Sequence, residues 1–307
     1  MWSSKTIFLG RQQSIEVIST DSGDRMKSNL GLTIVGQYIR HSPIETAKWR
    51  LGRFLRKRLT ANPVHSTVRM VGGSFMDLDT SEFLQRELYI QRELDPSIRL
   101  EITRRLKPGE TFLDIGANVG FYTLIAAKVV GRTGSVYAFE PAPNTRAGLE
   151  RNIQLNDFGN VTTVPVALSD ATGTGELFLD AKKNSGAASL RRSPNSGESV
   201  SVVVDTYDNF AALYALPIPA LVKIDVEGSE VSVLRGMTAL LSRPDRPAII
   251  LEVSEWSLEE MGYSKAELFR LVTSFGYRAT LLTQPVVSIF SGQNLYFQYD
   301  VLFEPTL

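Results

Sequence analysis

Between residues 111 and 303, short apolar runs alternate with stretches in which apolar residues recur at helical spacing. The runs predict strands at residues 111–115, 135–139, 161–166, 220–224 and 248–253. Helices are predicted between and after them, at residues 121–130, 143–155, 229–235 and 265–274. Two further strands are expected near residues 278–282 and at 295–303. This alternation is typical of a parallel β-sheet covered by helices.

The N-terminal part has a different pattern. Residues 1–70 show no sustained period until 44–59, where apolar residues recur at helical spacing and predict a helix. Its polar positions are almost all basic: Lys48, Arg50, Arg53, Arg56, Lys57 and Arg58, with Glu45 as the one acid. Such a face suits anionic lipid, a phosphorylated substrate or nucleic acid, although many charge runs are simply solvated.

The pattern also suggests the domain organisation. We expect a mostly helical extension at residues 1–70 and one α/β domain at 71–307. Residues 83–106 are expected to be mostly helical, and Pro108 and Gly109 end that stretch. The polar segment 181–199 contains two Ser-Gly pairs and predicts a long exposed loop.

Composition narrows the class of protein. The 307 residues carry 33 basic and 33 acidic side chains, so no overall charge favours nucleic acid. Cys is absent, which excludes disulfides, thiolate metal sites and a Cys nucleophile. No apolar run approaches the roughly 18 residues of a membrane span, and the N-terminus lacks a signal-peptide pattern. We therefore expect a cytoplasmic protein.

The most informative segment, Thr111–Tyr122, reads TFLDIGANVGFY. A strand is followed by Gly116 and Gly120 and then by a helix start, an arrangement that brings backbone close to a ligand. Asn118 occupies the slot of the second Gly in a dinucleotide fingerprint, which disfavours a pyrophosphate and a nicotinamide-dependent oxidoreductase. Asp114 favours a cationic ligand such as S-adenosylmethionine. The plainer alternative is a tight turn with a capping Asp.

Acidic residues also follow later strands. Glu140, before Pro141, lies where a carboxylate binds both hydroxyls of a ribose. Leu168 and Ser169 end the third predicted strand, where an adenine could stack.

The second informative segment is LVKIDVEGSEVSVLRG, which begins at Leu221. Charge in a buried strand is costly, so Lys223 and Asp225 are not incidental. They share a strand face and could form a purely structural pair. Glu227 and Glu252 are expected in the same crevice.

These motifs together resemble the FkbM family of S-adenosylmethionine-dependent methyltransferases. The resemblance rests on FLDIGANVGFY from Phe112, AFEPAPN from Ala138, NIQLN from Asn152 and KIDVEG from Lys223. It implies the class I methyltransferase fold, a Rossmann-like seven-stranded sheet with its last strand antiparallel, and usually O-methylation of a sugar or polyketide hydroxyl. It places the methionine part at Asp114, Gly116, Asn118 and Gly120, the ribose at Glu140, the adenine at Ser169 and the methyl group at Asp225. The full predicted set for S-adenosylmethionine adds Ala117, Phe121, Tyr122, Pro141 and Leu168.

For the reaction, we expect in-line methyl transfer assisted by a carboxylate base. Asp225 is the first candidate, Glu227 or Glu252 the second, and Lys223 completes the catalytic set. The two histidines, His41 and His65, lie outside the predicted sheet.

Two alternatives remain. The three carboxylates could hold Mg²⁺ or Ca²⁺ if the strand has ended by Val226. The second alternative is a non-catalytic cofactor-binding or scaffold protein that docks to membrane or an acidic polymer. The sequence does not determine the acceptor or the oligomeric state.

Overall fold

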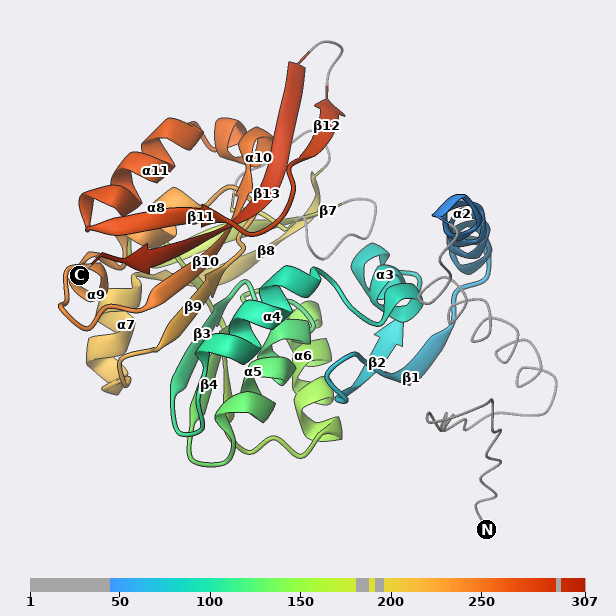
Figure 1. Cartoon of the computed structure of the whole chain (residues 1–307), viewed down its shortest axis with the longest axis horizontal. Coiled ribbons are helices and arrows are strands. Elements are labelled where there is room, and N and C mark those ends of the chain that lie inside the picture. Colours follow the sequence, from blue (N-terminus) through green and yellow to red (C-terminus); the bar gives the residue numbers. More distant parts are fainter. Residues whose placement is uncertain (1–44, 181–187, 191–195, 291–293, 307) are drawn as a thin grey trace. The chain divides into compact units, whose positions relative to one another are not determined.

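The computed structural model describes residues 45–180, 188–190, 196–290 and 294–306 (Figure 1). The chain divides into two compact units, and the boundary lies after Leu94. The predicted N-terminal extension lies within the first unit. Among the described residues, no helix combines the length and hydrophobicity that crossing a bilayer requires.

The described part of the first unit contains two helices and a hairpin. In chain order these are α2 (Glu45–Ala61), β1 (His65–Arg69), β2 (Phe75–Asp79) and α3 (Phe83–Gln91). The basic helix is confirmed. The β1–β2 hairpin was not predicted, because its strands have five residues each and offer too few alternations to recognise. Gly72 and Gly73, both with positive φ, form the turn that joins them.

The mostly helical character expected of residues 83–106 is confirmed, and the structure divides this stretch into two helices. α3 ends at Arg92, which has a φ of 62°, and a separate helix, α4 (Pro96–Arg105), begins in the second unit. Pro96 suits a helix start because its missing N–H has no partner in the first turn.

The second unit is built on a large sheet. Its central path has the order β11-β13-β10-β9-β3-β4-β5, and β12 pairs with β13 outside that path. The strands are β3 (Thr111–Ile115), β4 (Ser135–Phe139), β5 (Val161–Val164), β9 (Leu221–Ile224), β10 (Ala248–Ser254), β11 (Tyr277–Leu281), β12 (Val286–Phe290) and β13 (Asn294–Pro305). Neighbours from β5 to β10 are parallel, whereas β13 is antiparallel to both β10 and β11. The predicted seven-stranded path with an antiparallel last strand is confirmed.

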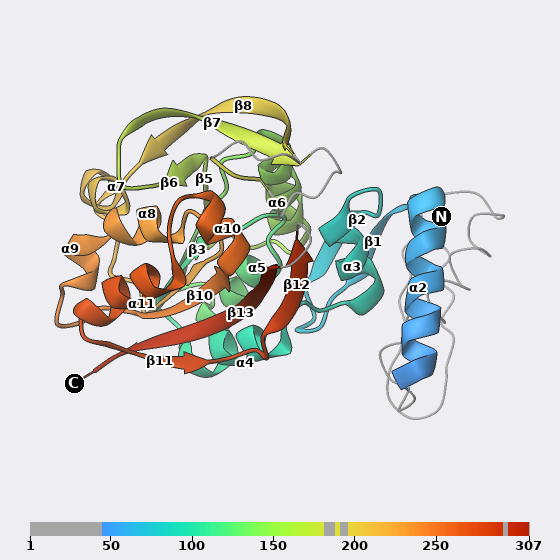
Figure 2. The same ribbon diagram turned by 90° about the horizontal axis from the view of Figure 1, so that it is seen from above.

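Helices cover both faces of this sheet (Figures 1 and 2). α4, α5 (Phe121–Val130) and α6 (Pro143–Leu155) lie on one face. The other face carries α7 (Tyr207–Tyr214), α8 (Glu230–Arg235), α9 (Thr238–Leu241), α10 (Glu255–Glu260) and α11 (Lys265–Ser274). Every residue of the central strands β3 and β9 is buried, as a parallel sheet covered on both sides requires.

A second, three-stranded sheet corrects two predictions. The strand expected at 161–166 ends at Val164, and Val166–Leu168 forms β6, which belongs to the sheet β6-β8-β7. Its other strands are β7 (Gly173–Asp180) and β8 (Ser196–Asp205). The loop expected at 181–199 was wrong at its C-terminal end, since residues 196–199 already belong to β8. Pro165 explains the switch of sheets, because proline cannot donate a ladder hydrogen bond.

Candidate functional site

The predicted site residues gather where parallel strands end. Gly116 follows β3, Glu140 follows β4 and Asp225 follows β9, and these three strands are neighbours. Glu252 lies within β10 rather than at its end, one residue beyond the Ile224–Leu251 pair. Ligands of such sheets bind at the carboxyl ends of the strands. We call this side of the sheet the carboxyl edge.

The turn after β3 packs tightly on the end of β9. A Cβ atom at Gly116 would lie 1.8 Å from the carbonyl oxygen of Asp225, and φ at Gly116 is 81°. Both constraints require glycine at this position. Asn118 has a φ of 50°, a conformation that asparagine adopts more readily than most residues. The motif therefore joins the β3–α5 turn directly to the segment that carries Asp225.

Glu140 closes the same turn from the β4 side. Its Oε2 accepts a hydrogen bond from the Asn118 backbone N–H, and its Oε1 accepts one from Ala142, both at 2.9 Å. Burial raises the pKa of Glu140 to about 7, although the two backbone donors act in the opposite direction. Each carboxylate oxygen keeps a second lone pair for a ligand donor.

Asp114 is buried beneath this turn. Its Oδ2 accepts from the Thr123 hydroxyl at 2.5 Å, whereas Oδ1 has no hydrogen-bond partner among the described residues. Burial raises the pKa of Asp114, and nearby Lys223 partly offsets that effect. A buried carboxylate oxygen without a partner costs free energy, so a donor or cation from a ligand would be favourable there.

Lys223 connects Asp114 to Asp225. It lies opposite Asp114 in the β3–β9 register, and its Nζ is 2.8 Å from Asp225 Oδ2. The same ammonium lies 5.0 Å from the ring centroid of Tyr122 in α5. Burial lowers the pKa of Lys223, but the Asp225 and Asp114 charges outweigh burial and raise it overall. The predicted pairing is confirmed, and Lys223 is a buried, charged residue.

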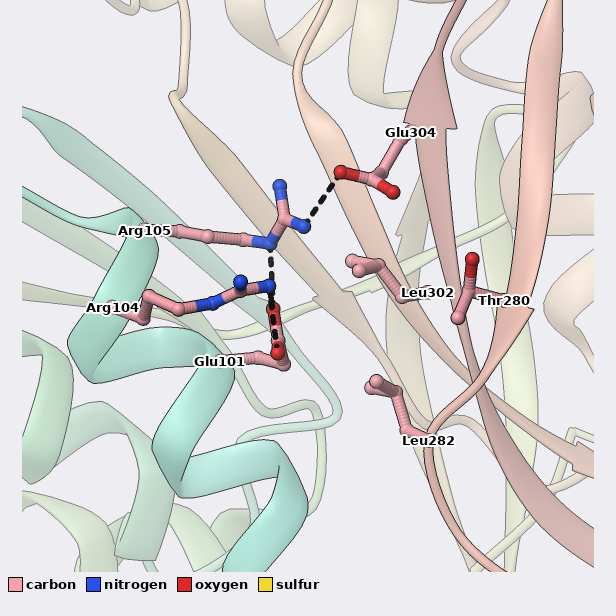
Figure 3. Close-up of a pocket in the computed structure, with 7 residues that line it drawn as sticks. All are labelled: Glu101, Arg104, Arg105, Thr280, Leu282, Leu302 and Glu304. Carbon is pink, nitrogen blue, oxygen red and sulfur yellow. Dashed lines mark hydrogen bonds and ion pairs between the residues drawn. The ribbon is translucent and has the colours of Figure 1, made fainter.

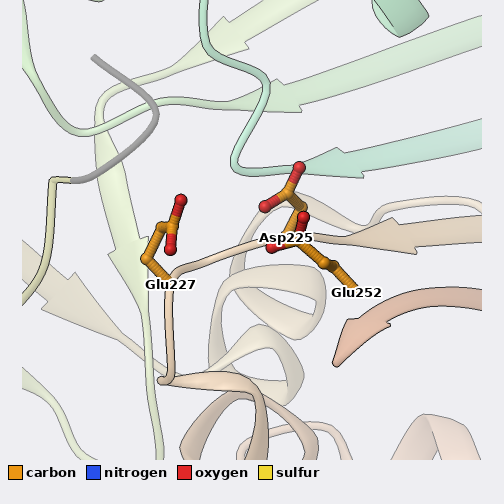
Figure 4. A group of neighbouring side chains, drawn as sticks. All are labelled: Asp225, Glu227 and Glu252. Carbon is orange, nitrogen blue, oxygen red and sulfur yellow. The ribbon is translucent and has the colours of Figure 1, made fainter. Parts of the chain in front are cut away.

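Three carboxylates form an acidic cluster, Asp225, Glu227 and Glu252 (Figure 4). One oxygen from each lies within 4.8 Å of those of the others. β9 ends at Ile224, and Glu227 has a φ of 51°. The turn at Val226 therefore lets the side chains of Asp225 and Glu227 point to one side, toward Glu252. Burial, followed by the charge of Asp225, raises the pKa of Glu227 and of Glu252 well above the usual value.

The cluster has supporting residues that the sequence did not single out for a role. Glu230 Oε1 accepts from the backbone N–H groups of Gly228 and Val226, at 3.1 and 3.3 Å, and so holds the turn that carries Glu227. Asp300 of β13 lies opposite Glu252 and is 8% exposed. A signal existed for Asp300, since it is the one acid within the alternating strand pattern of residues 295–303.

Other predicted residues lie differently. Leu168 and Ser169 belong to or follow β6 in the second sheet, where the Ser169 carbonyl packs against Gly236. No described contact joins them to the β3–α5 turn, and their role at adenine stays a prediction. Ala117, Phe121 and Tyr122 are buried at the turn and the start of α5, with the two aromatic rings 5.1 Å apart.

Pro141, Arg146 and the histidines complete the set. The Arg146 guanidinium donates to the carbonyl oxygens of Glu140 and Pro141, both at 3.2 Å, and braces that corner of the edge. His65 bonds to Asp77 in the first unit, and His41 lies outside the described residues.

A separate hollow of about 480 Å³ lies between α4 and strands β11 and β13 (Figure 3). Its two guanidiniums, from Arg104 and Arg105, form ion pairs with Glu101, and Arg105 also pairs with Glu304. These charges are balanced within the hollow. It shares no residue with the acidic cluster.

The carboxyl edge suits one class of ligand. Asp114 and the acidic cluster place four carboxylates around one ammonium, that of Lys223, which favours a ligand with positive charge. Glu140 offers free lone pairs to hydroxyl donors. A molecule with a ribose and a cationic centre, such as S-adenosylmethionine, fits both features. The acidic cluster could also coordinate a divalent cation through its oxygens.

Comparison with known proteins agrees with this chemistry. The model of the methyltransferase FkbM domain matches residues 114–279. The chain is 25% identical over 264 residues to 31-O-demethyl-FK506 methyltransferase FkbM of Streptomyces tacrolimicus, covering 76% of this chain and 95% of that protein. It is 29% identical over 128 residues to hexuronic acid methyltransferase AglP of Haloferax volcanii, covering 42% and 50% of the two chains. Among solved structures, methyltransferase FkbM from Methylobacillus flagellatus KT aligns at 15% identity with a TM-score of 0.44, over 92% of this chain and 60% of that one.

Proposed function

Because this chain belongs to the FkbM methyltransferase family, whose methyl donor is S-adenosylmethionine, we propose that it methylates a hydroxyl group of a sugar, glycan or polyketide-like acceptor. The observation that carries the proposal is the contact between the β3–α5 turn and Asp225, which puts the expected donor site beside the acidic cluster. The names of two relatives add support, since one refers to 31-O-demethyl-FK506 and the other to hexuronic acid.

Residues on both sides of the β3–α5 turn would hold the donor. Glu140 would accept hydrogen bonds from the ribose hydroxyls, and the turn from Gly116 to Gly120 would approach the methionine part. The unpartnered Oδ1 of Asp114 would face its positively charged portion. When bound, S-adenosylmethionine supplies a methyl group on a positively charged sulfur, which is electrophilic toward an oxygen nucleophile.

The acidic cluster would handle the acceptor and its proton. Lys223 holds Asp225 Oδ2, so Oδ1 is the atom of Asp225 that would accept the hydroxyl proton. Glu227 and Glu252 lie around it, and burial together with the charge of Asp225 raises the pKa of both well above the usual value, which favours their protonated forms. Positioning of the reacting atoms supplies about 7 to 11 kcal/mol in well-oriented reactions, and a base adds roughly 10²- to 10⁴-fold.

The segment before β8 would select the acceptor. Residues 181–187 and 191–195 lie outside the described residues, but Ser189 lies beside the cluster. Its Oγ donates to the Glu227 carbonyl at 3.5 Å, and its backbone forms a bridge with Phe178 of β7. This contact supports a role in acceptor recognition for the residues of this chain that lie next to Ser189 in sequence.

Carboxylate catalysis and metal assistance differ in one simple test. If Asp225 acts as the base, incubation with EDTA followed by removal of the chelator leaves the initial rate within twofold of the untreated enzyme. Loss of more than 90% of the rate, restored by Mg²⁺ or Ca²⁺, would assign the cluster to a divalent cation instead.

The proposal is tested by transfer of a radiolabelled methyl group to a panel of acceptors. The panel contains hexuronic acid oligosaccharides and macrolides with a free secondary hydroxyl, each paired with the analogue that lacks this hydroxyl. We expect label only in hydroxyl-bearing acceptors. Asp225→Asn should slow turnover at saturating donor by a factor of roughly 100 or more, beyond any change in donor binding. Glu259→Gln, an exposed change in α10, is the control. Donor binding without transfer to any acceptor would favour a non-catalytic cofactor-binding protein.

A further inference from the structure

The basic helix α2 has one buried side that fixes its orientation within the first unit. Leu55 and Leu59, one turn apart, are 1% and 0% exposed. At their flank, the Arg56 guanidinium donates to both carboxylate oxygens of Glu87 in α3, at 2.7 and 2.8 Å. At about 100° per residue, Arg50 and Lys57 lie about 180° and about 160° around the helix from Leu59, and Phe54 lies about 140° from it.

The exposed side of α2 presents an aromatic ring among cations. Phe54 is 59% exposed, and Arg50, Lys57 and Arg58 are exposed as well. Arg50 and Arg58 lie one turn before and after Phe54, and Lys57 lies three residues beyond it, so all three neighbour the ring on the helix surface. We call these four residues the Phe54 face.

The charge on this face is of one sign. From residue 50 to the end of α2 there is no Asp or Glu. Within the described part of the chain, none of the three cations forms an ion pair with a carboxylate, unlike Arg56. The exposed phenylalanine adds apolar area in the middle of this cationic surface.

An anionic bilayer surface accommodates both features at once. Its headgroups attract Lys and Arg, and the boundary between headgroups and acyl chains accepts an aromatic side chain. Double-helical RNA is contacted mainly through its phosphates and 2′-hydroxyls, so it would use the charges without burial of the ring. We propose that the Phe54 face docks the protein on a membrane surface rich in anionic lipid. This inference goes beyond the methyl-transfer reaction and does not depend on it.

The test measures partitioning of the full chain, without methyl donor, onto sedimentable vesicles. Vesicles of phosphatidylcholine alone are compared with vesicles containing about 30% phosphatidylserine or phosphatidylglycerol, the anionic lipids that attract basic helices. We expect binding only to the anionic vesicles, weakening as salt is raised. Lys57→Glu/Arg58→Glu should lower the partition coefficient at least roughly 25-fold, since about 1 kcal/mol per cation corresponds to about fivefold each.

Two matched controls separate the face from general charge and hydrophobicity. Lys107→Glu/Arg132→Glu makes the same change of charge at exposed positions of the second unit. Leu213→Ser removes a side chain that is 70% exposed on α7, for comparison with Phe54→Ser. Each control should change the partition coefficient by less than about twofold. Phe54→Ser should lower it roughly 10-fold, because the ring is no longer available for burial in the bilayer. Far-ultraviolet circular dichroism verifies that each variant is folded.

Several results would overturn the proposal. Absence of binding to anionic vesicles at about 0.1 M salt, where the Debye length is still about 10 Å, is one. Equal losses in the α2 and control variants are another. Binding to poly(U) that depends on Lys57 and Arg58, together with vesicle binding that Phe54→Ser does not affect, would assign the face to a nucleic acid instead.

Discussion

Glu140 gives the sharpest test of the donor site. Each of its oxygens accepts one backbone N–H, so Glu140→Ala leaves two donors without partners and removes the proposed ribose contacts. Hydrogen bonds to a charged group contribute about 1.5–3 kcal/mol each. Two lost ribose contacts therefore correspond to about 3 kcal/mol at the lower limit, or roughly a 100-fold increase in the Kd of S-adenosylmethionine.

Substitution by glutamine should fare little better. Its amide oxygen can accept from Asn118 or from Ala142, but its NH₂ group then faces the other N–H, donor against donor. We therefore expect Glu140→Gln to bind the donor at least roughly 30-fold more weakly than wild type. The matched control is Glu259→Ala, an exposed change in α10, and it should change Kd less than about twofold.

Isothermal titration calorimetry with S-adenosylmethionine and S-adenosylhomocysteine is the assay, because both ligands carry the same ribose. The pKa of Glu140 is raised to about 7, and the ionised form is the stronger acceptor. Wild-type Kd should therefore fall as pH rises from 6 to 8, and the Ala variant should show a smaller change. If folded Glu140→Ala and Glu140→Gln both bind within threefold of wild type, Glu140 does not contact the ribose.

Three further substitutions test the structure around the site, each by chemical denaturation. Gly116→Ala should cost more than about 3 kcal/mol because its Cβ meets a carbonyl at 1.8 Å. Gly159→Ala, where a Cβ enters open space, should change stability by less than about 1 kcal/mol, and equal costs would contradict the clash. Lys223→Met should lower the free energy of unfolding by about 3 kcal/mol, because it leaves buried carboxylates unpaired. Lys265→Met, which removes a half-exposed ion pair, should lower it by less than about 1 kcal/mol. Similar losses in the two variants would refute the argument from burial. Burial raises the pKa of Glu230 to about 7, so its protonated form adds stability below about pH 4.5 that is lost as pH rises through 7. Glu230→Gln keeps an oxygen that can accept from both turn N–H groups. Its free energy of unfolding relative to wild type should rise by up to about 3 kcal/mol between pH 5 and pH 8, because glutamine does not ionise. No such rise would show that ionisation of Glu230 does not destabilise the fold.

The order of elements in the second unit followed from local patterns. The strands Thr111–Ile115 and Ser135–Phe139 and the helices Phe121–Val130, Pro143–Leu155 and Lys265–Ser274 have the predicted bounds. Their apolar runs and the Gly and Pro residues at their ends are adjacent in sequence, so local physics suffices to define them. The smaller sheet was missed for two reasons. Its strand β6 has only three residues, and β8, the strand that pairs with β6, lies about 40 residues further along the chain.

The sequence by itself determined which chemical groups lie at the carboxyl ends of the strands. Glycines at Gly116 and Gly120, the acid at Glu140 and the Lys223–Asp225 pair could be assigned from strand ends and a two-residue period. These assignments need only the rule that parallel strands end at one edge of a sheet.

Only the tertiary structure decided how those groups interact. The left-handed conformation of Glu227, the turn held by Glu230 and the position of Asp300 opposite Glu252 bring carboxylates together from β9, β10 and β13. Contacts between strands separated by tens of residues depend on sheet order and register, which no local pattern contains. The raised pKa values of Glu227 and Glu252 follow from the same assembly, because burial and neighbouring charge exist only once the chain has folded.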